Sequence, residues 1–348
     1  MISIVIVMLK HIRRTARVAL VSIFLVILAG SVVRMTGSGM GCPDWPKCFG
    51  YIIPPTEESA VSWEANREYH KGQMIIHDQE LLIATSDFNT SEEFNDTHWS
   101  VYEKHDYAVF NVAHTWTEYI NRLLGAFSGL PVLILFLLCL KMIRKDALLT
   151  VLALGILLML GFEAWLGKVV VDSNLSEYKI SLHMIGAMFI VALILLLMRR
   201  AKAGGIAVEV SKWYRILIIA IILLGLVQIG LGTLVRENID QIAKDGTIAR
   251  IDWVDNLSAK FLIHRSYAWV VMIAVGLAFY VKRQKKFDLP EIQGLAIVVL
   301  AEIGVGALLS YAGMPALLQP VHLLLGFIMF ALAFQSLLRT ISIHKIQE

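Results

Sequence analysis

Residues 261–286, FLIHRSYAWVVMIAVGLAFYVKRQKK, decide the fold of this chain. The apolar run predicted over 259–281 is long enough to cross about 30 Å of hydrocarbon as a helix. His264 stands near its beginning, and four basic residues follow its end. Because an ionisable side chain inside a bilayer is costly, the histidine predicts a functional site. The basic residues predict that this end of the helix faces the cytoplasm.

The rest of the chain repeats this pattern. Its 348 residues are 57% hydrophobic and only 17% charged, with a mean hydropathy of +0.68, which is far from the average soluble protein. We therefore predict an all-α integral membrane protein. Eight spans are predicted, at 18–34, 112–140, 147–171, 180–198, 213–235, 259–281, 291–311 and 319–338.

Basic residues predict the orientation of the spans. They precede the first span and follow spans two, four and six, as Lys10, Arg13, Arg14 and Arg17; Lys141, Arg144 and Lys145; Arg199, Arg200 and Lys202; and Lys282, Arg283, Lys285 and Lys286. Because such residues stay cytoplasmic in short loops, we predict a bacterial cytoplasmic (inner) membrane protein with both termini cytoplasmic. The 35–110 segment, with thirteen acidic and four basic residues, would be extracytoplasmic. We expect no nucleic-acid partner.

An internal repeat relates the two halves of the chain. The odd-numbered spans end alike, in G30SVVR34, G167KVVVD172, G232TLVRE237 and G306ALLSYAG313. Among the even-numbered spans, N121RLLG pairs with H264RSYAW, and L182HMIGA pairs with V321HLLLG. The repeat predicts two four-helix bundles related by a pseudo-twofold axis. The predicted divisions are a cytoplasmic segment at 1–17, a first bundle at 18–198 with its loop at 35–110, a linker at 199–212, a second bundle at 213–338 and a cytoplasmic tail at 339–348.

The candidate metal ligands are three histidines at the outer ends of even-numbered spans. His264 and His322 lie at the same depth and predict a six-coordinate haem b with one imidazole on each face. In the first half His183 has Asn121 at its partner position, and a neutral amide is a poor ligand for iron. The alternative interpretation is that each histidine is a polar residue bonded within its bundle.

Charged residues near these positions carry further hypotheses. Arg265 and Arg236 are candidates to pair with haem propionates. Glu118, on the same helical face as Asn121, is either a surface anion at the helix start or a proton acceptor. Arg122 would either neutralise Glu118 or hold a propionate.

Two further features leave alternatives open. Glu163 and Glu302 form a second symmetric pair, and they are either structural hydrogen-bonding groups or parts of a proton path. Cys42 and Cys48, in CPDWPKC, lie on the oxidising side and can pair. The cysteine pair is either a structural disulfide or a redox pair. Within the loop, residues 63–85 are consistent with a helix.

Five motifs together resemble the haem A synthase family over nearly the whole chain. They are V33RMTGSGMGCPDWPKCFG50, E118YINRLLG125, S181LHMIGA187, F261LIHRSYAW269 and P320VHLLLGF327. The resemblance implies an eight-helix oxidoreductase that converts haem O to haem A for terminal oxidase assembly. It would oxidise a pyrrole methyl to a formyl group through hydroxymethyl and hydrate stages.

The resemblance also implies roles for single residues. His264 and His322 match the ligands of haem b, while Asn121 and His183 match the substrate-haem positions. Glu118 matches the functionally important glutamate, with Arg122 and Asn121 beside it in the catalytic half. Cys42 and Cys48 match the extracytoplasmic cysteine pair, which implies a disulfide. The histidine expected at 121 is absent, so the ligation of the substrate iron departs from the family pattern.

The implied partners follow from this chemistry. They are haem O, delivered by a haem O synthase, membrane lipid and an electron donor or acceptor that the sequence does not identify. The oligomeric state, including a homo-oligomer, stays open. The alternative functions are a di-haem b electron carrier, which would need two complete bis-histidine sites, and a haem chaperone or transporter, which would not need Glu118. A non-haem transporter would explain neither the glycines nor the cysteines.

Overall fold

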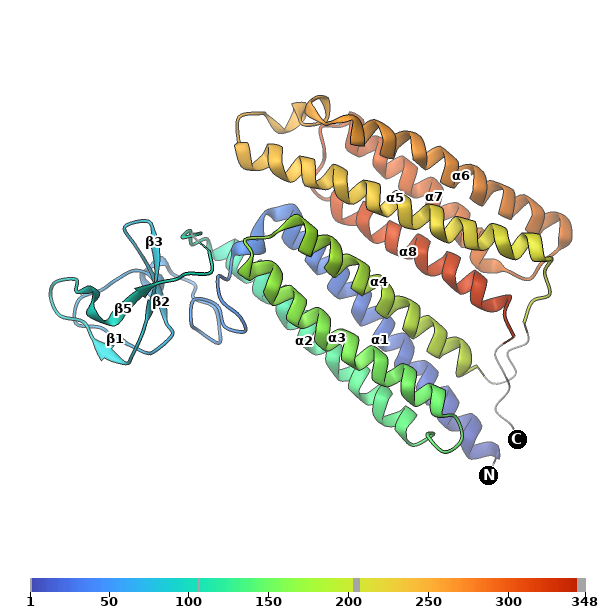
Figure 1. Cartoon of the computed structure of the whole chain (residues 1–348), viewed down its shortest axis with the longest axis horizontal. Helices are drawn as coiled ribbons and strands as arrows, with labels where there is room; N and C mark the ends of the chain where they lie inside the picture. The colour runs from blue at the N-terminus through green and yellow to red at the C-terminus, as the bar shows by residue number, and fades with distance from the viewer. Residues whose placement is uncertain (1, 106, 203–206, 343–348) are drawn as a thin grey trace. The chain divides into compact units, whose positions relative to one another are not determined.

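The computed structural model describes residues 2–105, 107–202 and 207–342 (Figure 1). Within these ranges the chain forms eight long helices: α1 Ile2–Thr36, α2 Val112–Leu140, α3 Ala147–Asp172, α4 Glu177–Arg200, α5 Lys212–Asp245, α6 Ala259–Lys285, α7 Pro290–Tyr311 and α8 Leu318–Arg339. All eight are long and apolar enough to cross a membrane. The predicted all-α, eight-span, multi-pass membrane protein is confirmed.

Two helices extend well beyond the spans predicted for them. α1 continues toward the N-terminus, where Leu9, Ile12 and Ala16 are buried at helical spacing. α5 continues past 235 because Ile239 and Ile242 keep its apolar face buried. It ends at Gly246, whose φ of +63° is the left-handed conformation that glycine adopts readily.

The chain divides into two compact units, and the boundaries between them fall inside helices α1 to α4. Unit 1 comprises Met1–Leu28, Phe127–Leu160 and Met184–Glu348, and unit 2 comprises Ala29–Ala126 and Gly161–His183. The predicted division into two bundles stays a prediction, and residues 343–348 of the predicted tail and 203–206 of the predicted linker lie outside the described residues.

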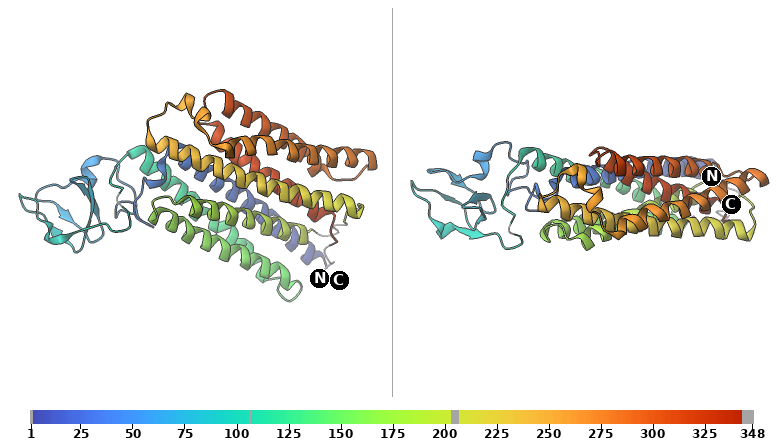
Figure 2. Two further views of the ribbon diagram at one scale, coloured as in Figure 1. Left: turned by 45° about the horizontal axis from the view of Figure 1, so that its top comes forward. Right: turned by 90° about the horizontal axis from the view of Figure 1, so that it is seen from above.

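The core of unit 1 has two main parts. In one, parts of α1 to α4 pack with α8 through buried side chains such as Ile12, Leu135, Ile156, Ile194 and Phe327. In the other, α5 to α8 run side by side (Figure 2) and bury apolar residues of all four helices. This second part holds the helices that carry His264 and His322.

Unit 2 contains a small β-structure between α1 and α2, and it includes residues 63–85, whose sequence pattern alone is consistent with a helix. The strands are β1 Glu68–Tyr69, β2 Met74–His77, β3 Glu80–Ala84, β4 Phe88–Asn89 and β5 Trp99–Val101, with β2, β3 and β5 in one antiparallel sheet and β1 paired with β4.

Residues 63–85 form strands and not a helix because a tight turn interrupts the apolar pattern. Asp78 and Gln79 have φ of +48° and +67° and connect β2 to β3. A two-residue loop with both φ values positive favours a β-hairpin. The β-branched Ile75, Ile76 and Ile83 fit its strands.

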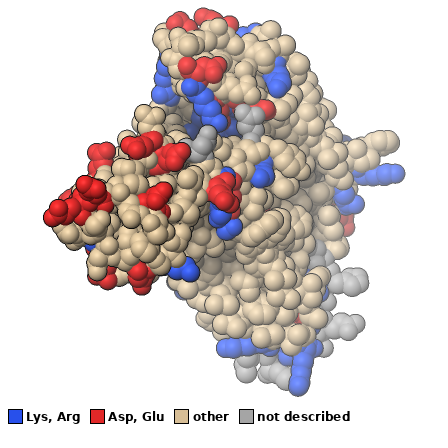
Figure 3. Space-filling view, turned by 60° about the vertical axis from the view of Figure 1, so that its left-hand side comes forward, with Lys and Arg blue, Asp and Glu red and all other residues tan. Residues whose placement is uncertain are grey.

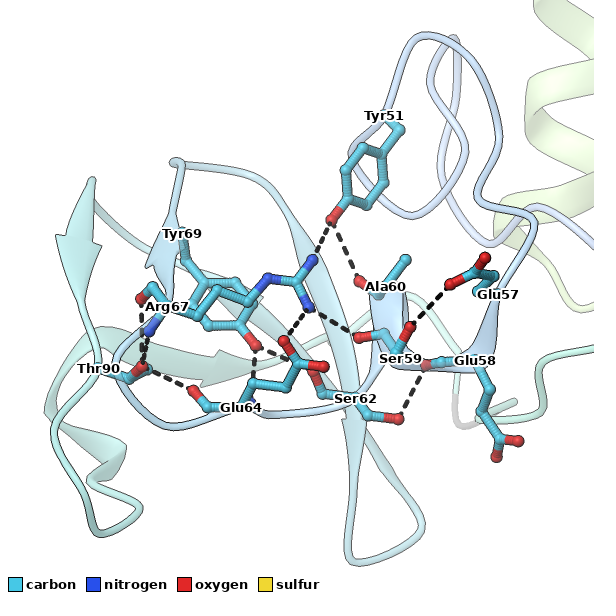
Figure 4. Close-up of polar contacts among 10 residues, drawn as sticks. All are labelled: Tyr51, Glu57, Glu58, Ser59, Ala60, Ser62, Glu64, Arg67, Tyr69 and Thr90. Atoms are coloured by element: carbon cyan, nitrogen blue, oxygen red, sulfur yellow. Dashed lines mark hydrogen bonds and ion pairs between the residues drawn. The ribbon is translucent and has the colours of Figure 1, made fainter.

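Polar contacts fix the chain that leads into these strands (Figure 4). The Arg67 guanidinium donates to the backbone oxygen of Ser59 at 2.8 Å and lies 3.3 Å from Oε2 of Glu64. The hydroxyl of the buried Tyr69 donates to the backbone oxygen of Ser62 at 2.9 Å and accepts from the amide of Glu64 at 3.0 Å. Burial raises the pKa of this phenol, so it stays protonated and keeps its donor role.

The β-structure carries the acidic character read from the sequence. Figure 3 shows acidic side chains gathered on the face that it turns to the viewer, with few basic ones among them. Between 35 and 110 the chain has thirteen Asp and Glu and four Lys and Arg. Lys104 forms an ion pair within unit 2: its Nζ lies 3.3 Å from Oδ1 of Asp172 at the end of α3.

Candidate functional site

One glycine of each odd-numbered helix faces one predicted ligand position. A methyl group on Gly30 would lie 3.8 Å from Oδ1 of Asn121, and one on Gly167 would lie 3.9 Å from Cε1 of His183. A methyl group on Gly232 would lie 3.1 Å from Cε1 of His264, and one on Gly306 would lie 3.3 Å from Cε1 of His322. A methyl group would crowd the rings of His264 and His322, whereas at Gly30 and Gly167 it would make ordinary contacts with Asn121 and His183. The sequence repeat therefore corresponds to a repeated contact between a glycine of one helix and a predicted ligand position of another.

In unit 1, α6 and α8 place two imidazoles opposite each other. The ring centroids of His264 and His322 lie 6.3 Å apart, with the ring planes at 84°. An iron ion between two imidazoles needs centroids roughly 6 Å apart, because each metal–nitrogen bond is about 2 Å and each nitrogen lies roughly 1 Å from its centroid. The structure brings these two predicted residues together at a spacing that fits a haem iron.

The site around His264 also contains a polar residue that the sequence interpretation missed. Gln228 of α5 donates from Nε2 to the backbone oxygen of His264 at 3.1 Å. Nδ1 of His264 and Oε1 of Gln228 are buried without a hydrogen-bond partner among the described residues. A signal was present, because Gln228 precedes Gly232 by four residues, as Glu163 precedes Gly167 and Glu302 precedes Gly306.

In unit 2, Asn121 and His183 lie against Gly30 and Gly167. Oδ1 of Asn121 is buried and has no hydrogen-bond partner among the described residues. His183 keeps 42% of its side chain exposed, and its Nδ1 lies 2.6 Å from Oε2 of the buried Glu163. One imidazole and one unpartnered amide are therefore available to a ligand in this unit.

Glu118 on α2 is buried, with 3% of its surface exposed, so it is not a surface anion. Its Oε2 accepts a hydrogen bond from the amide of Cys42 at 2.9 Å, and its Oε1 pairs with Arg122 one helical turn later. The carboxylate is thus held from two sides. A buried carboxylate held in this way is a candidate to take a proton from a ligand beside α2.

Arg122 joins α2 to the cysteine loop. Its guanidinium donates to the backbone oxygens of Asp44 at 2.6 Å, Lys47 at 3.0 Å and Cys42 at 2.9 Å. A planar guanidinium suits such a set of oxygens, because its five N–H groups point outward in fixed directions. The structure therefore assigns this side chain four protein acceptors, including Glu118.

The loop itself is closed and docked. Cys42 and Cys48 form a disulfide, with Cα atoms 4.7 Å apart, and both residues are fully buried. Next to it, a methyl group on Gly41 would lie 2.4 Å from the backbone oxygen of His114. The hydroxyl of Thr115 donates to the backbone oxygen of Gly41 at 2.8 Å. Only glycine at 41 lets the loop approach the first turn of α2 this closely.

Asp44 stabilises the same loop from within. Its Oδ2 accepts a hydrogen bond from the amide of Gly50 at 3.0 Å. Burial raises the pKa of this carboxyl, although the Gly50 amide and the nearby Arg122 charge oppose the rise.

The two arginines predicted to pair with haem propionates differ in their contacts with the protein. Arg236 pairs with Asp240 at 2.7 Å and donates to the side chain of Gln319 on α8. Arg265 is exposed, and its guanidinium lies 5.7 Å from the ring centroid of Phe261.

A comparison with known families identifies the family of this chain. Residues 13–88 and 71–334 match the COX15-CtaA family, described as cytochrome oxidase assembly protein. The chain belongs to this family. The matched residues include the four predicted ligand positions, Glu118 and the disulfide loop. The resemblance inferred from the five motifs is confirmed.

Members of the family that are called haem A synthase are similar to most of the chain. The protein of Shewanella oneidensis is 29% identical over 245 residues, which is 70% of this chain and 62% of that protein. The protein of Bartonella henselae is 26% identical over 347 residues, covering 92% of this chain and 88% of that protein. The protein of Bartonella tribocorum is 28% identical over 302 residues, covering 79% and 77%.

Proposed function

We propose that this protein, a haem A synthase, oxidises a methyl group of haem O to a formyl group in the half of the chain that holds Glu118, Asn121 and His183. Haem b is held in the other half, between His264 and His322. The observation that carries the proposal is the 6.3 Å separation of these two imidazoles. The product, haem A, serves cytochrome oxidase assembly, the function by which the family is described.

The second half offers a fixed place for a resident cofactor. His264 and His322 would hold haem b through their imidazoles, and Gly232 and Gly306 leave room for the two rings. Arg236 and Arg265 supply positive charge beside the two helices, where propionates need it. Bound there, haem b supplies one-electron transfer, which side chains alone do not provide.

The first half receives the substrate. His183 binds the iron of haem O from one side, and Asn121 presents a weakly ligating amide in place of a second imidazole. With water as the oxygen source and the redox partner as the electron acceptor, the methyl group becomes an alcohol and then an aldehyde, and its C–H hydrogens leave as protons. Glu118 accepts them, held in place by the Cys42 amide and Arg122. The apolar tail of haem O lies among the helices, which explains why the reaction takes place in a membrane.

The placement in the membrane follows from the basic loops. Both termini are cytoplasmic, and the segment with the disulfide and the β-strands is on the extracytoplasmic side of a bacterial cytoplasmic membrane. The divisions inferred from the repeat apply: a first bundle at 18–198 for the substrate and a second at 213–338 for haem b. A haem O synthase delivers the substrate, and a separate redox partner exchanges electrons with haem b.

Coexpression with a haem O synthase tests this function. We expect membranes that contain both proteins to accumulate haem A, measured by chromatography of the extracted haems. We expect His322→Ala to lose haem b from the purified protein and to stop conversion. Accumulation of haem O alone, with a folded wild-type protein that contains haem b, would contradict the synthase function and favour an electron carrier or a haem chaperone.

A further inference from the structure

Two glutamates lie against two of the proposed iron ligands in the same way. Nδ1 of His183 lies 2.6 Å from Oε2 of Glu163, and Nδ1 of His322 lies 3.3 Å from Oε2 of Glu302. Each glutamate precedes its histidine by 20 residues and precedes by four the glycine that faces the same ring. The pairs therefore belong to the repeated unit and are not isolated contacts.

Among the residues that the structure describes, no lysine or arginine pairs with either carboxylate. The side chain of Glu163 is 7% exposed and that of Glu302 is 20% exposed. Glu291 of α7, by contrast, pairs with Arg339. Because a buried carboxylate needs a partner, the imidazole is the group that keeps each glutamate inside the helix layer.

We propose that Glu163 and Glu302 are positioning residues, which orient the iron-binding histidines and set their strength as donors. In the structure each pair lies within ion-pair distance but outside hydrogen-bond geometry. With a carboxylate beside Nδ1, Nε2 is the ring nitrogen left to bind the iron, and a small rotation of the side chains would complete the Nδ1–H···O hydrogen bond. A carboxylate acceptor on the far nitrogen fixes the tautomer and raises the basicity of the ligand. This inference rests on the proposed haem sites.

The four ligand positions are not equivalent in this respect. The residue four positions before the facing glycine is Gln228 in α5 and Val26 in α1. Gln228 donates to the backbone oxygen of His264, and among the described residues no carboxylate lies within ion-pair distance of that ring, in contrast to His183 and His322. Each haem is therefore served by one histidine with a carboxylate behind it. In the first half that histidine is His183, and the partner position holds Asn121 in place of a second imidazole. Glu163 therefore sets the electron-donor strength of the one imidazole proposed to bind the substrate iron.

The reduction potential of haem b tests the role of Glu302. We expect Glu302→Gln to retain haem b and to shift its potential to a more positive value, since a weaker donor stabilises ferric iron less. A tenfold change in the reduction equilibrium, 59 mV for one electron, is the expected size. Glu291→Gln, which removes a carboxylate from the same helix, is the matched control and should leave the potential unchanged. Glu302→Asp, which keeps a carboxylate, should stay closer to the wild-type value than Glu302→Gln.

The outcomes separate this inference from the function on which it rests. If His322→Ala loses haem b but Glu302→Gln has the wild-type potential, the positioning role of Glu302 is refuted and the haem site stands. If His322→Ala keeps haem b unchanged, the haem site itself is wrong. Loss of haem b from Glu302→Gln, with retention in Glu302→Asp, would support the carboxylate's role.

A second measurement tests Glu163 in the first half. In purified protein loaded with haem O and reduced, resonance Raman spectroscopy reports the iron–histidine stretch. We expect Glu163→Gln to lower this frequency and His183→Ala to abolish it. An unchanged frequency in Glu163→Gln would refute the role of Glu163, whereas a mode that survives His183→Ala would refute the assignment of His183 as ligand.

Discussion

The amide of Cys42 donates a hydrogen bond to Oε2 of Glu118 at 2.9 Å. This contact connects the disulfide loop to the one carboxylate of α2, across 76 residues of sequence. Arg122 completes the connection, because it pairs with Glu118 and donates to three backbone oxygens of the loop. The position of the proposed proton acceptor therefore depends on the loop as well as on the helix.

Replacing Glu118 by Gln should stop the reaction without removing haem b. The amide keeps an oxygen for the Cys42 hydrogen bond but does not accept a proton as a carboxylate does, so we expect a rate loss of about 10²-fold or more. The measurement is the haem A to haem O ratio in coexpressing cells, with haem b content determined on the purified protein. Glu93→Gln, which changes an exposed carboxylate of the outer segment, should have no effect. Equal conversion by Glu118→Gln and wild type would rule out the proton-acceptor role.

Breaking the disulfide should loosen the loop and slow conversion together. Cys42 and Cys48 enclose a short loop, for which the chain-entropy effect is about 2 kcal/mol. We expect Cys48→Ser to make the 37–111 segment roughly 30-fold more susceptible to limited proteolysis. Conversion should fall as well, because the Cys42 amide supports Glu118. A variant that becomes protease-sensitive but converts haem O at the wild-type rate would separate the loop from the reaction.

The sequence was sufficient for the eight membrane-spanning helices because long apolar runs are local signals. The repeat also predicts that His264 lies opposite His322, and the two rings do lie 6.3 Å apart. The ends of α1 and α5 were missed because polar residues there, such as Glu237 and Asp240, conceal a helix whose other face is buried.

Contacts made by long-range packing were not predictable in the same way. Arg122 was expected to neutralise Glu118 or hold a propionate, and its contacts with the backbone oxygens of Asp44 and Lys47 depend on how the loop folds back on α2. The β-hairpin was missed because the Asp78-Gln79 turn lacks a glycine, so the hairpin signal was weak. Glu163 and Glu302 were recognised as a symmetric pair, but only their distances to His183 and His322 separate a ligand-positioning role from other roles.

A methyl group at Gly306 should disturb the haem b site. In Gly306→Ala the added carbon would lie 3.3 Å from Cε1 of His322, closer than ordinary contact, so the ring must move. We expect reduced haem b content or a changed low-spin absorption spectrum in the purified protein. Gly304→Ala is the matched control, because a methyl group there meets no atom within 4 Å. Both variants carry the same change in helix propensity, so a similar loss of haem b in the control would assign the effect to the helix and not to the ring.

Replacing Asn121 by His restores the histidine of the family pattern at the proposed substrate site and tests what its absence does. The variant places a second imidazole opposite His183 in the proposed site, and imidazole binds haem iron far better than an amide does. We expect haem O bound to Asn121→His to show a low-spin spectrum and to be converted more slowly, since both axial positions are then taken by the protein. Asn121→Gln, which keeps the amide, is the control and should not become low-spin. If Asn121→His instead converts haem O faster than the wild type, a second imidazole assists the reaction, and the wild-type asparagine limits its rate.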